Sequence, residues 1–516
     1  MVPFRLSRRE IRRVFALTAL FFFAAYLSRF VSFGFTHDSL QIDQSGGALF
    51  QISLGRFMQP LYWLIRGDIV MPYVVGLLAF AFLGASLCLC CALLSIRSTL
   101  GVACVCMTLC CNATLSLSSA TFISWLDVYM LALLLSVLSV CLCESMRLGF
   151  LLAPFVLCLS LGLYQSYLQT AILLFLMLLI HRALDGDPLP SLVVRGFKAL
   201  FVLLAGLLLY ALFSKLAMRF AQVNVADTYN GIAHVGDWGD ASVLSLLAET
   251  YVAPLAYLLS PETIYPRWTT FTTLAIFALS LPALVSSLAR QKKRLHRLFV
   301  LLMLLLVPLG ANAVSFISGG LSHALMIYSY FFVLLLPLSL AERRAREENI
   351  RPRQKLASAA LLLSCALLYA GNAAFAQQLI LRRNLEYQST LSLMTRVIER
   401  ADTVEGYSRG VTPVVFSGSL FSSQLAMERP GFEGTTSLFG ENNLYAITAE
   451  DYYPWYVNQI LGYSMRFDVS LLPDYLNQPR RRARHARLPC GWEHPDDRRR
   501  AGRAYRKAAV GRVNLS

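Results

Sequence analysis

Residues 34–68 hold the ionisable side chains whose types and spacing best suit a chemical task. The segment reads GFTHDSLQIDQSGGALFQISLGRFMQPLYWLIRGD and contains Asp38, Asp43, Arg56 and Arg66. A carboxylate can take a proton from a hydroxyl group as a general base, or can bind a divalent cation. A guanidinium group suits a phosphate, because its planar fork donates two parallel hydrogen bonds. The segment could therefore combine a base with a phosphate site; the alternative is an ordinary solvated loop.

Three further ionisable residues lie in or beside apolar runs. Asp127 follows Trp125 inside such a run, where a carboxylate indicates either a functional site or a helix-pairing contact. Lys215 and Arg219 lie at the end of another run. There they either stabilise a charged leaving group or extend to the lipid headgroups.

The chain that carries these residues is too apolar for a soluble protein. Of its 516 residues 56% are hydrophobic and 15% are charged, and its mean hydropathy is +0.56. Ordinary soluble proteins carry about a quarter charged residues. This composition excludes a soluble enzyme, a disordered scaffold and a nucleic-acid-binding module, and it predicts an all-α polytopic membrane protein.

The apolar residues gather in runs of the length that a membrane helix needs, which is about 20 residues. The sequence predicts about eleven membrane-spanning helices. They are Val14–Phe33, Ile69–Leu94, Leu100–Leu117, Thr121–Cys143, Leu148–Leu163, Tyr164–His181, Phe197–Met218, Thr269–Ala289, Leu298–Phe316, Leu321–Leu340 and Leu356–Phe375.

Basic residues in short loops indicate the cytoplasmic side of a membrane. With the N-terminus in the cytoplasm, eleven crossings also place Arg97 and the basic clusters at 290–297 and 343–355 there. Residues 34–68 and the C-terminus then face the periplasm. The segment Val243–Ser260 is predicted to lie at the outer interface, since a twelfth crossing would reverse a basic cluster.

Composition divides the chain into three parts. Residues 1–376 form the predicted membrane region, and 377–479 are predicted to form a small external domain of mixed α/β structure. Residues 480–516 are rich in arginine and are predicted to be disordered. Their abrupt change of composition is typical of a shifted reading frame, and the alternative is a genuine basic tail that contacts anionic lipid. The formal net charge of +16 therefore combines an orientation signal with this tail and indicates no nucleic-acid partner.

Other motifs narrow the class of protein. Eleven of the twelve cysteines fall inside apolar runs, which favours small packing groups over disulfides or metal ligands. The chain contains no P-loop or HExxH motif, which argues against ATP-driven transport and against zinc-dependent hydrolases of the HExxH type.

Three short motifs, in this order, resemble the bacterial glucosyltransferase-II family of serotype-converting membrane enzymes. They are H-D ending at Asp38, G-R-F at residues 55–57, and LSLGLYQSYLQT around Tyr164 and Gln165. The resemblance runs from about residue 14 to about residue 477.

This resemblance implies a GT-C-like glycosyltransferase of the bacterial inner membrane. Such an enzyme takes a hexose, usually glucose, from a polyprenyl-phosphate lipid. It adds the sugar to a surface glycan such as the O-antigen of lipopolysaccharide, on the outer side of the membrane. The implied partners are thus the donor lipid, the acceptor glycan and the membrane itself.

The family's acidic motif maps onto Asp38, which is the candidate base. Family members often have a second acid directly after the first, but this chain has Ser39 there and its next acid is Asp43. We therefore take Asp38 and Asp43 as catalytic candidates and assign no metal, although a divalent cation (Mg²⁺ or Mn²⁺) would suit two carboxylates. The candidates for binding donor phosphate or substrate are Arg56, Tyr164, Gln165, Lys215, Arg219 and Asp127.

Two other functions stay open at this point. A flippase or transporter of lipid-linked sugars would use the same helices without chemistry, and charged residues midway through several helices would favour it. An O-antigen polymerase-like protein would place its main outer loop between two helices rather than after the last one.

Overall fold

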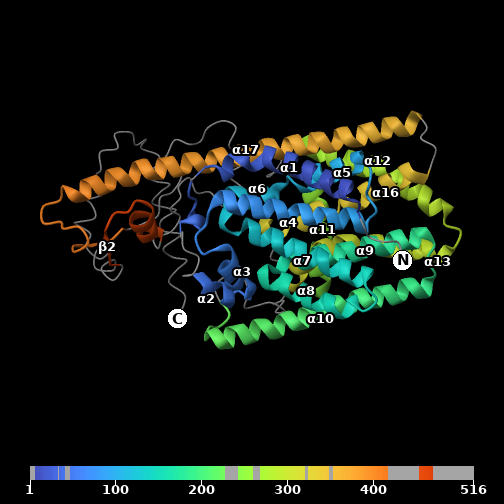
Figure 1. Cartoon of the computed structure of the whole chain (residues 1–516), viewed down its shortest axis with the longest axis horizontal. Coiled ribbons are helices and arrows are strands. Elements are labelled where there is room, and N and C mark those ends of the chain that lie inside the picture. The colour runs from blue at the N-terminus through green and yellow to red at the C-terminus, as the bar shows by residue number, and fades with distance from the viewer. Residues whose placement is uncertain are drawn as a thin grey trace.

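The computed structural model describes residues 6–32, 34–40, 47–226, 242–259, 268–319, 323–347, 352–416 and 452–468. Its helices form one elongated bundle, with α10 along one edge and α17 along the opposite edge (Figure 1). The all-α polytopic fold that the sequence predicts is confirmed.

In chain order the helical elements of the first half are α1 (Arg8–Phe30), η1 (His37–Ser39), α2 (Ala48–Ser53), α3 (Met58–Arg66), α4 (Pro72–Leu93), α5 (Thr99–Leu109), α6 (Ala113–Ala120), η3 (Ile123–Trp125), α7 (Leu126–Ser145), α8 (Gly149–Leu163), η4 (Gln165–Tyr167), α9 (Leu168–Asp185) and α10 (Leu189–Ala221). The second half contains α11 (Val243–Leu259), α12 (Trp268–Arg290), α13 (Arg294–Ala311), α14 (Ala313–Ile317), η6 (Ala324–Met326), α15 (Tyr328–Phe332), α16 (Leu335–Glu347), α17 (Pro352–Asp402), β1 (Pro413–Val414), α19 (Tyr452–Pro454), η9 (Trp455–Ile460) and β2 (Arg466–Phe467).

Local sequence explains where several helices begin and end. Ser7 and Glu10 form a capping box at the start of α1, so two backbone N–H groups gain side-chain partners. Gly186 ends α9 in the left-handed conformation at φ 85°, which favours glycine. Pro190 lies in the first turn of α10, where a backbone N–H group would have no helical partner in any case.

In the described part of the chain, nine helices are long and apolar enough to cross a membrane. They are Arg8–Phe30, Pro72–Leu93, Ile123–Ser145, Gln165–Asp185, Leu189–Ala221, Trp268–Arg290, Arg294–Ala311, Ala324–Arg346 and Gln354–Asp402. The predicted span Leu100–Leu117 is a pair of helices, α5 and α6, bent by 55°, and the predicted span Leu148–Leu163 is the 15-residue helix α8. Each of the eleven predicted spans therefore coincides with helix, but two of them are shorter or broken.

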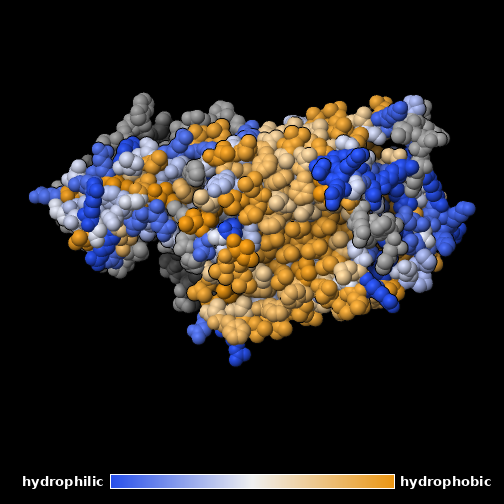
Figure 2. All heavy atoms as spheres, in the orientation of Figure 1, coloured by the Kyte–Doolittle hydropathy of each residue, from blue (hydrophilic) through white to orange (hydrophobic). Residues whose placement is uncertain are grey.

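On the face shown in Figure 2, a broad apolar belt covers the middle of the bundle, and hydrophilic residues gather at its two ends. Contacts at one end join loops that the basic residues assign to the cytoplasm. Arg13 donates to the carbonyl oxygen of Arg97 at 2.9 Å, and Glu342 accepts from the backbone N–H of Arg97 at 3.0 Å. Arg343 pairs with Asp185 at 2.6 Å. These loops share one end of the bundle, as the predicted orientation requires.

The break between α5 and α6 is closed by side chains from distant helices. Asn112 caps α6 by accepting from the backbone N–H of Leu115 at 3.1 Å. Asn372 of α17 donates to the carbonyl oxygen of Cys111 at 3.1 Å, and Tyr328 donates to that of Leu109 at 3.1 Å. All eight residues of α6 are buried, so the apolar interior holds a short helix rich in hydroxyl groups.

A second, small core lies beyond the apolar belt, around the far end of α17. It joins Leu40, Met394, Tyr453, Tyr456 and Val457, among others. Strand β1 pairs in parallel with β2 beside this core. Helix α17 passes the predicted boundary at residues 376–377 without a break, so the external domain stays a prediction. The eleven cysteines in the described residues are free, and most are buried, as the packing interpretation predicts.

Candidate active site

Asp38 lies in the single turn η1, at the end of the bundle that also carries α2 and α3. The turn is fixed because Thr36 donates its hydroxyl to the carbonyl oxygen of Thr121 at 2.6 Å and its backbone N–H to the hydroxyl of Ser39 at 2.8 Å. Trp125 donates its indole N–H to one carboxylate oxygen of Asp38 at 2.6 Å. The side chain of Asp38 is half-buried. The carboxylate is thus held in place without being sealed from solvent, as a general base requires.

The G-R-F motif follows α2 and is held by close backbone packing. Gly55 has φ 74°, and a Cβ atom there would collide with the hydroxyl of Tyr210 on α10. Phe57 lies against the rings of Tyr210 and Phe213, each with its centroid 6.3 Å away. Only glycine fits this position, so the sequence motif fixes where Arg56 emerges.

Arg56 is brought together with the Tyr-Gln pair that the sequence singles out. Its guanidinium carbon lies 5.1 Å from the ring centroid of Tyr164. One guanidinium N–H group of Arg56 donates to the side-chain oxygen of Gln51 at 3.2 Å. Gln165 donates to the carbonyl oxygen of Leu54 at 2.7 Å and to the hydroxyl of Tyr210 at 2.9 Å. The predicted residues Arg56, Tyr164 and Gln165 therefore form one cluster.

Asp127 is enclosed by α3 rather than open to a ligand. Arg66 lies 3.0 Å from one carboxylate oxygen, and Tyr62 donates to the other at 2.9 Å. The side chains of Arg66 and Asp127 are 2% and 0% exposed. Burial, followed by the charge of Asp127, raises the pKa of Tyr62, so Tyr62 stays a hydrogen-bond donor. This geometry favours a positioning role for Asp127 over direct substrate contact.

Aromatic side chains connect these groups. The ring centroids of Trp63 and Trp125 lie 5.5 Å apart, and Trp125 is the residue that donates to Asp38. The rings of Tyr129 and Tyr164 lie 4.5 Å apart, between Asp127 and the Arg56 cluster. The base and the arginine cluster are therefore parts of one packed region, although no sequence pattern indicated Trp125 as a partner of Asp38.

Lys215 and Arg219 are exposed on the last turns of α10, although Ser214 beside them is buried. Asp43 lies outside the described residues. Within the described ranges, no group of three or more His, Cys, Asp or Glu side chains is placed to hold a metal ion.

The structure adds charged residues that the sequence analysis did not select. Arg29 of α1 and Arg382, Arg383 and Glu386 of α17 are all buried. Two sequence signals could have found them. Arg29 is a charge inside a predicted span, and the Arg-Arg pair precedes Glu386 by one helical turn.

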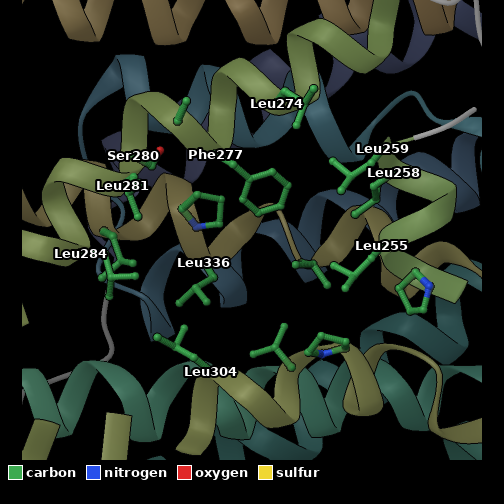
Figure 3. Close-up of a pocket in the computed structure, with 17 residues that line it drawn as sticks. Leu255, Leu258, Leu259, Leu274, Phe277, Ser280, Leu281, Leu284, Leu304 and Leu336 are labelled. Atoms are coloured by element: carbon green, nitrogen blue, oxygen red, sulfur yellow. The ribbon is translucent and has the colours of Figure 1, made fainter. Parts of the chain in front are cut away.

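An apolar cavity of about 440 Å³ lies between α11, α12, α13 and α16 (Figure 3). Leu255, Phe277, Leu304 and Leu336 are among its lining residues, and Ser280 is the polar side chain in the lining. None of the predicted site residues lines this cavity. It suits a hydrocarbon group and offers no ionisable group for catalysis.

Comparison with known proteins identifies a family for this chain. A family model described as Glucosyl transferase GtrII matches residues 27–337, which is more than half of the chain and includes every predicted site residue. No curated protein and no solved structure matches the chain.

Proposed function

We propose that this chain, which belongs to the glucosyl transferase GtrII family, moves glucose from a polyprenyl-phosphate lipid to a surface glycan such as the O-antigen of lipopolysaccharide. Family membership makes the protein a glucosyltransferase, and its apolar helices make it a membrane protein. A lipid-linked donor is supported by the position of Asp38 and Arg56 at one end of an apolar bundle. The phosphate of such a donor lies at the same level, just outside the hydrocarbon core.

Asp38 is the proposed general base. It takes the proton of an acceptor hydroxyl, and the acceptor oxygen then forms a bond to the anomeric carbon of the glucosyl group. The bond between that carbon and the phosphate oxygen breaks, and polyprenyl phosphate leaves with the electron pair. Phosphate is a good leaving group, so one carboxylate suffices, unlike the paired acid and base of hydrolases.

The observation that carries this assignment is the hydrogen bond from Trp125 to Asp38. The bond, at 2.6 Å, holds one carboxylate oxygen in place, and the Asp38 side chain is half-buried rather than fully enclosed. Arg56, Tyr164 and Gln165 supply hydrogen-bond donors and an aromatic face of the kind that sugars require. In this proposal they bind the sugar and its acceptor beside the base.

The second core supports an outer position for the acceptor. Leu40, two residues after Asp38, packs with Met394 of α17 and with Tyr456. A domain at residues 377–479 would thus contact the catalytic turn directly and could receive the glycan on the periplasmic side. The N-terminus would then be cytoplasmic, together with the loops around Arg97 and Arg343.

A transfer assay with the purified full-length protein tests the proposal. The protein in lipid nanodiscs receives radiolabelled polyprenyl-phosphate-glucose and lipopolysaccharide, and label in the glycan is measured. Asp38→Asn should lower the rate by about 100- to 10,000-fold, as loss of a general base does. Asp68→Asn is the matched control, because Asp68 is an exposed carboxylate near the end of the same segment.

Two outcomes would change the assignment. Wild-type transfer by Asp38→Asn would show that Asp38 is not the base. No transfer with any lipid-linked hexose, combined with movement of that lipid between leaflets of the nanodisc-matched vesicle, would favour the flippase.

A further inference from the structure

Three buried arginines gather at the same end of the bundle as Asp38. Arg382 and Arg383 of α17 share the carboxylate of Glu386, at 2.9 Å and 2.6 Å. Their side chains are 3% and 4% exposed. Arg29, in the last turn of α1, is 1% exposed and feels the like charge of Arg383. Together these four side chains carry three positive charges and one negative charge.

Arg29 is the member of this cluster that calls for an anion. It donates one long hydrogen bond, of 3.4 Å, to the carbonyl oxygen of Ser32. Its Nε atom has no hydrogen-bond partner, and no carboxylate within the described ranges lies at ion-pair distance. A buried charge without a counter-charge strongly destabilises a fold. A buried guanidinium whose Nε–H has no partner can still donate a hydrogen bond to a ligand that supplies an acceptor.

The cluster lies beside the catalytic turn. Arg383 donates its Nε–H to the hydroxyl of Thr121 at 2.9 Å, and Thr36 donates to the carbonyl oxygen of the same Thr121 at 2.6 Å. Thr36 precedes Asp38 by two residues. The connection after α1 also packs tightly on α17, since a Cβ atom on Gly34 would lie 2.7 Å from the side-chain oxygen of Asn384. Thr121 thus bonds both to Arg383 and to Thr36, in the turn that carries Asp38.

We propose that Arg29 and Arg383 form a binding site for a phosphate group, and that a lipid-linked phosphate fills it. The last turn of a membrane-spanning helix lies where lipid phosphates lie. An arginine fork binds phosphate with two parallel hydrogen bonds, which are strongest away from water. Within the proposed function, which this inference deepens, the site holds the phosphate of the donor and of the product polyprenyl phosphate. Arg56 is then left to the sugar and acceptor.

Ligand-induced stabilisation in the absence of any acceptor tests the site. Full-length protein in phosphatidylcholine nanodiscs is heated with a thiol-reactive dye, which reports exposure of the buried cysteines. Three probes separate the chemistry: farnesyl phosphate, farnesol and inorganic phosphate. Farnesyl phosphate should raise the midpoint of unfolding, and farnesol should not. A rise with inorganic phosphate alone would identify the ligand as a free anion and overturn the lipid-linked assignment.

Variants locate the binding. Arg29→Gln should lower the affinity for farnesyl phosphate by about 10- to 100-fold, which is the loss expected for a charge-assisted hydrogen bond. It should also unfold at the same or a higher temperature than wild type without ligand, because it removes an uncompensated charge. Arg29→Lys keeps the charge and should retain part of the affinity. Arg195→Gln is the control, because Arg195 pairs with Glu144 at 2.6 Å on another face of the bundle.

The results separate this site from the proposed reaction. Unchanged farnesyl phosphate affinity in Arg29→Gln overturns the site, even if transfer is observed. A lower unfolding temperature without ligand together with unchanged affinity would make Arg29 a structural residue. If Arg29→Gln lowers the affinity for farnesyl phosphate but the wild-type protein never transfers glucose, the phosphate site is supported and the proposed reaction is refuted. Arg56→Gln should lower transfer and leave farnesyl phosphate affinity unchanged.

Discussion

Replacing Arg66 with leucine would leave the carboxylate of Asp127 buried with Tyr62 as its main remaining side-chain partner. Both members of the pair are almost fully enclosed, and the oxygen–nitrogen distance is 3.0 Å. Removing one partner of a buried ion pair costs about 3–5 kcal/mol, since the other charge stays desolvated. Tyr62→Phe removes one hydrogen bond to the same carboxylate, which is worth about 1.5–3 kcal/mol. We therefore expect Arg66→Leu to be the more damaging change.

The double variant Arg66→Leu/Asp127→Leu is the informative one. It removes both charges together, and apolar replacements of buried ion pairs are often neutral or stabilising. We expect it to be more stable than either single variant. The free energy of unfolding is measured by detergent titration in bicelles, with the reaction of buried cysteines such as Cys90 and Cys104 as the signal.

The same set of variants decides whether Asp127 touches substrate. If Asp127 positions α3, transfer should fall in proportion to stability, and the double variant should recover both. If the double variant loses as much free energy of unfolding as the two single variants together, the two residues are not coupled, which would refute the reasoning. A stable Asp127→Asn protein with a raised KM would instead place Asp127 in the substrate site.

Three further changes test other parts of the structure. Gly55→Ala should lower transfer at least about tenfold and reduce stability by a few kcal/mol, because the new Cβ meets Tyr210 at a left-handed φ; circular dichroism melting and the transfer assay check this. Trp125→Phe removes the hydrogen bond to Asp38 and should lower kcat about tenfold with little change in melting temperature. Lys215→Gln/Arg219→Gln should keep wild-type stability, as both side chains are exposed, and its transfer rate shows whether they help the reaction.

The membrane helices could be predicted because each one follows from its own residues. A helix in lipid must satisfy its backbone internally, so an apolar run of sufficient length is almost enough to define it. The broken span is the exception. Asn112 has the side chain to cap a new helix, but the partner that closes the break, Asn372, lies 261 residues from Cys111 in the chain. No local pattern in the sequence connects them.

The candidate site was predictable only in part for the same reason. The motif resemblance grouped Arg56 with Tyr164 and Gln165. The structure places Arg56 over the ring of Tyr164, and Gln165 donates to the carbonyl oxygen of Leu54, two residues before Arg56. The partners of Asp38 and Asp127 depend on how α3 and α7 rotate against their neighbours, which apolar periodicity leaves open when a helix is apolar all round. Arg29 could have been suspected as a charge within a span, and Arg383 as a helical partner of Glu386, but no pattern in the sequence indicates that these two arginines lie near each other.

The break between α5 and α6 also constrains how the protein is made. The carbonyl groups of Leu109 and Cys111 enter the membrane early in synthesis, whereas their donors Tyr328 and Asn372 are translated 219 and 261 residues later. Until then these carbonyls have no such partners in a solvent that offers none. The hydrogen bonds at this break can therefore form only after Tyr328 and Asn372 have been synthesised. A nascent chain that stops before α17 would therefore lack the Asn372 side chain that donates to the carbonyl oxygen of Cys111.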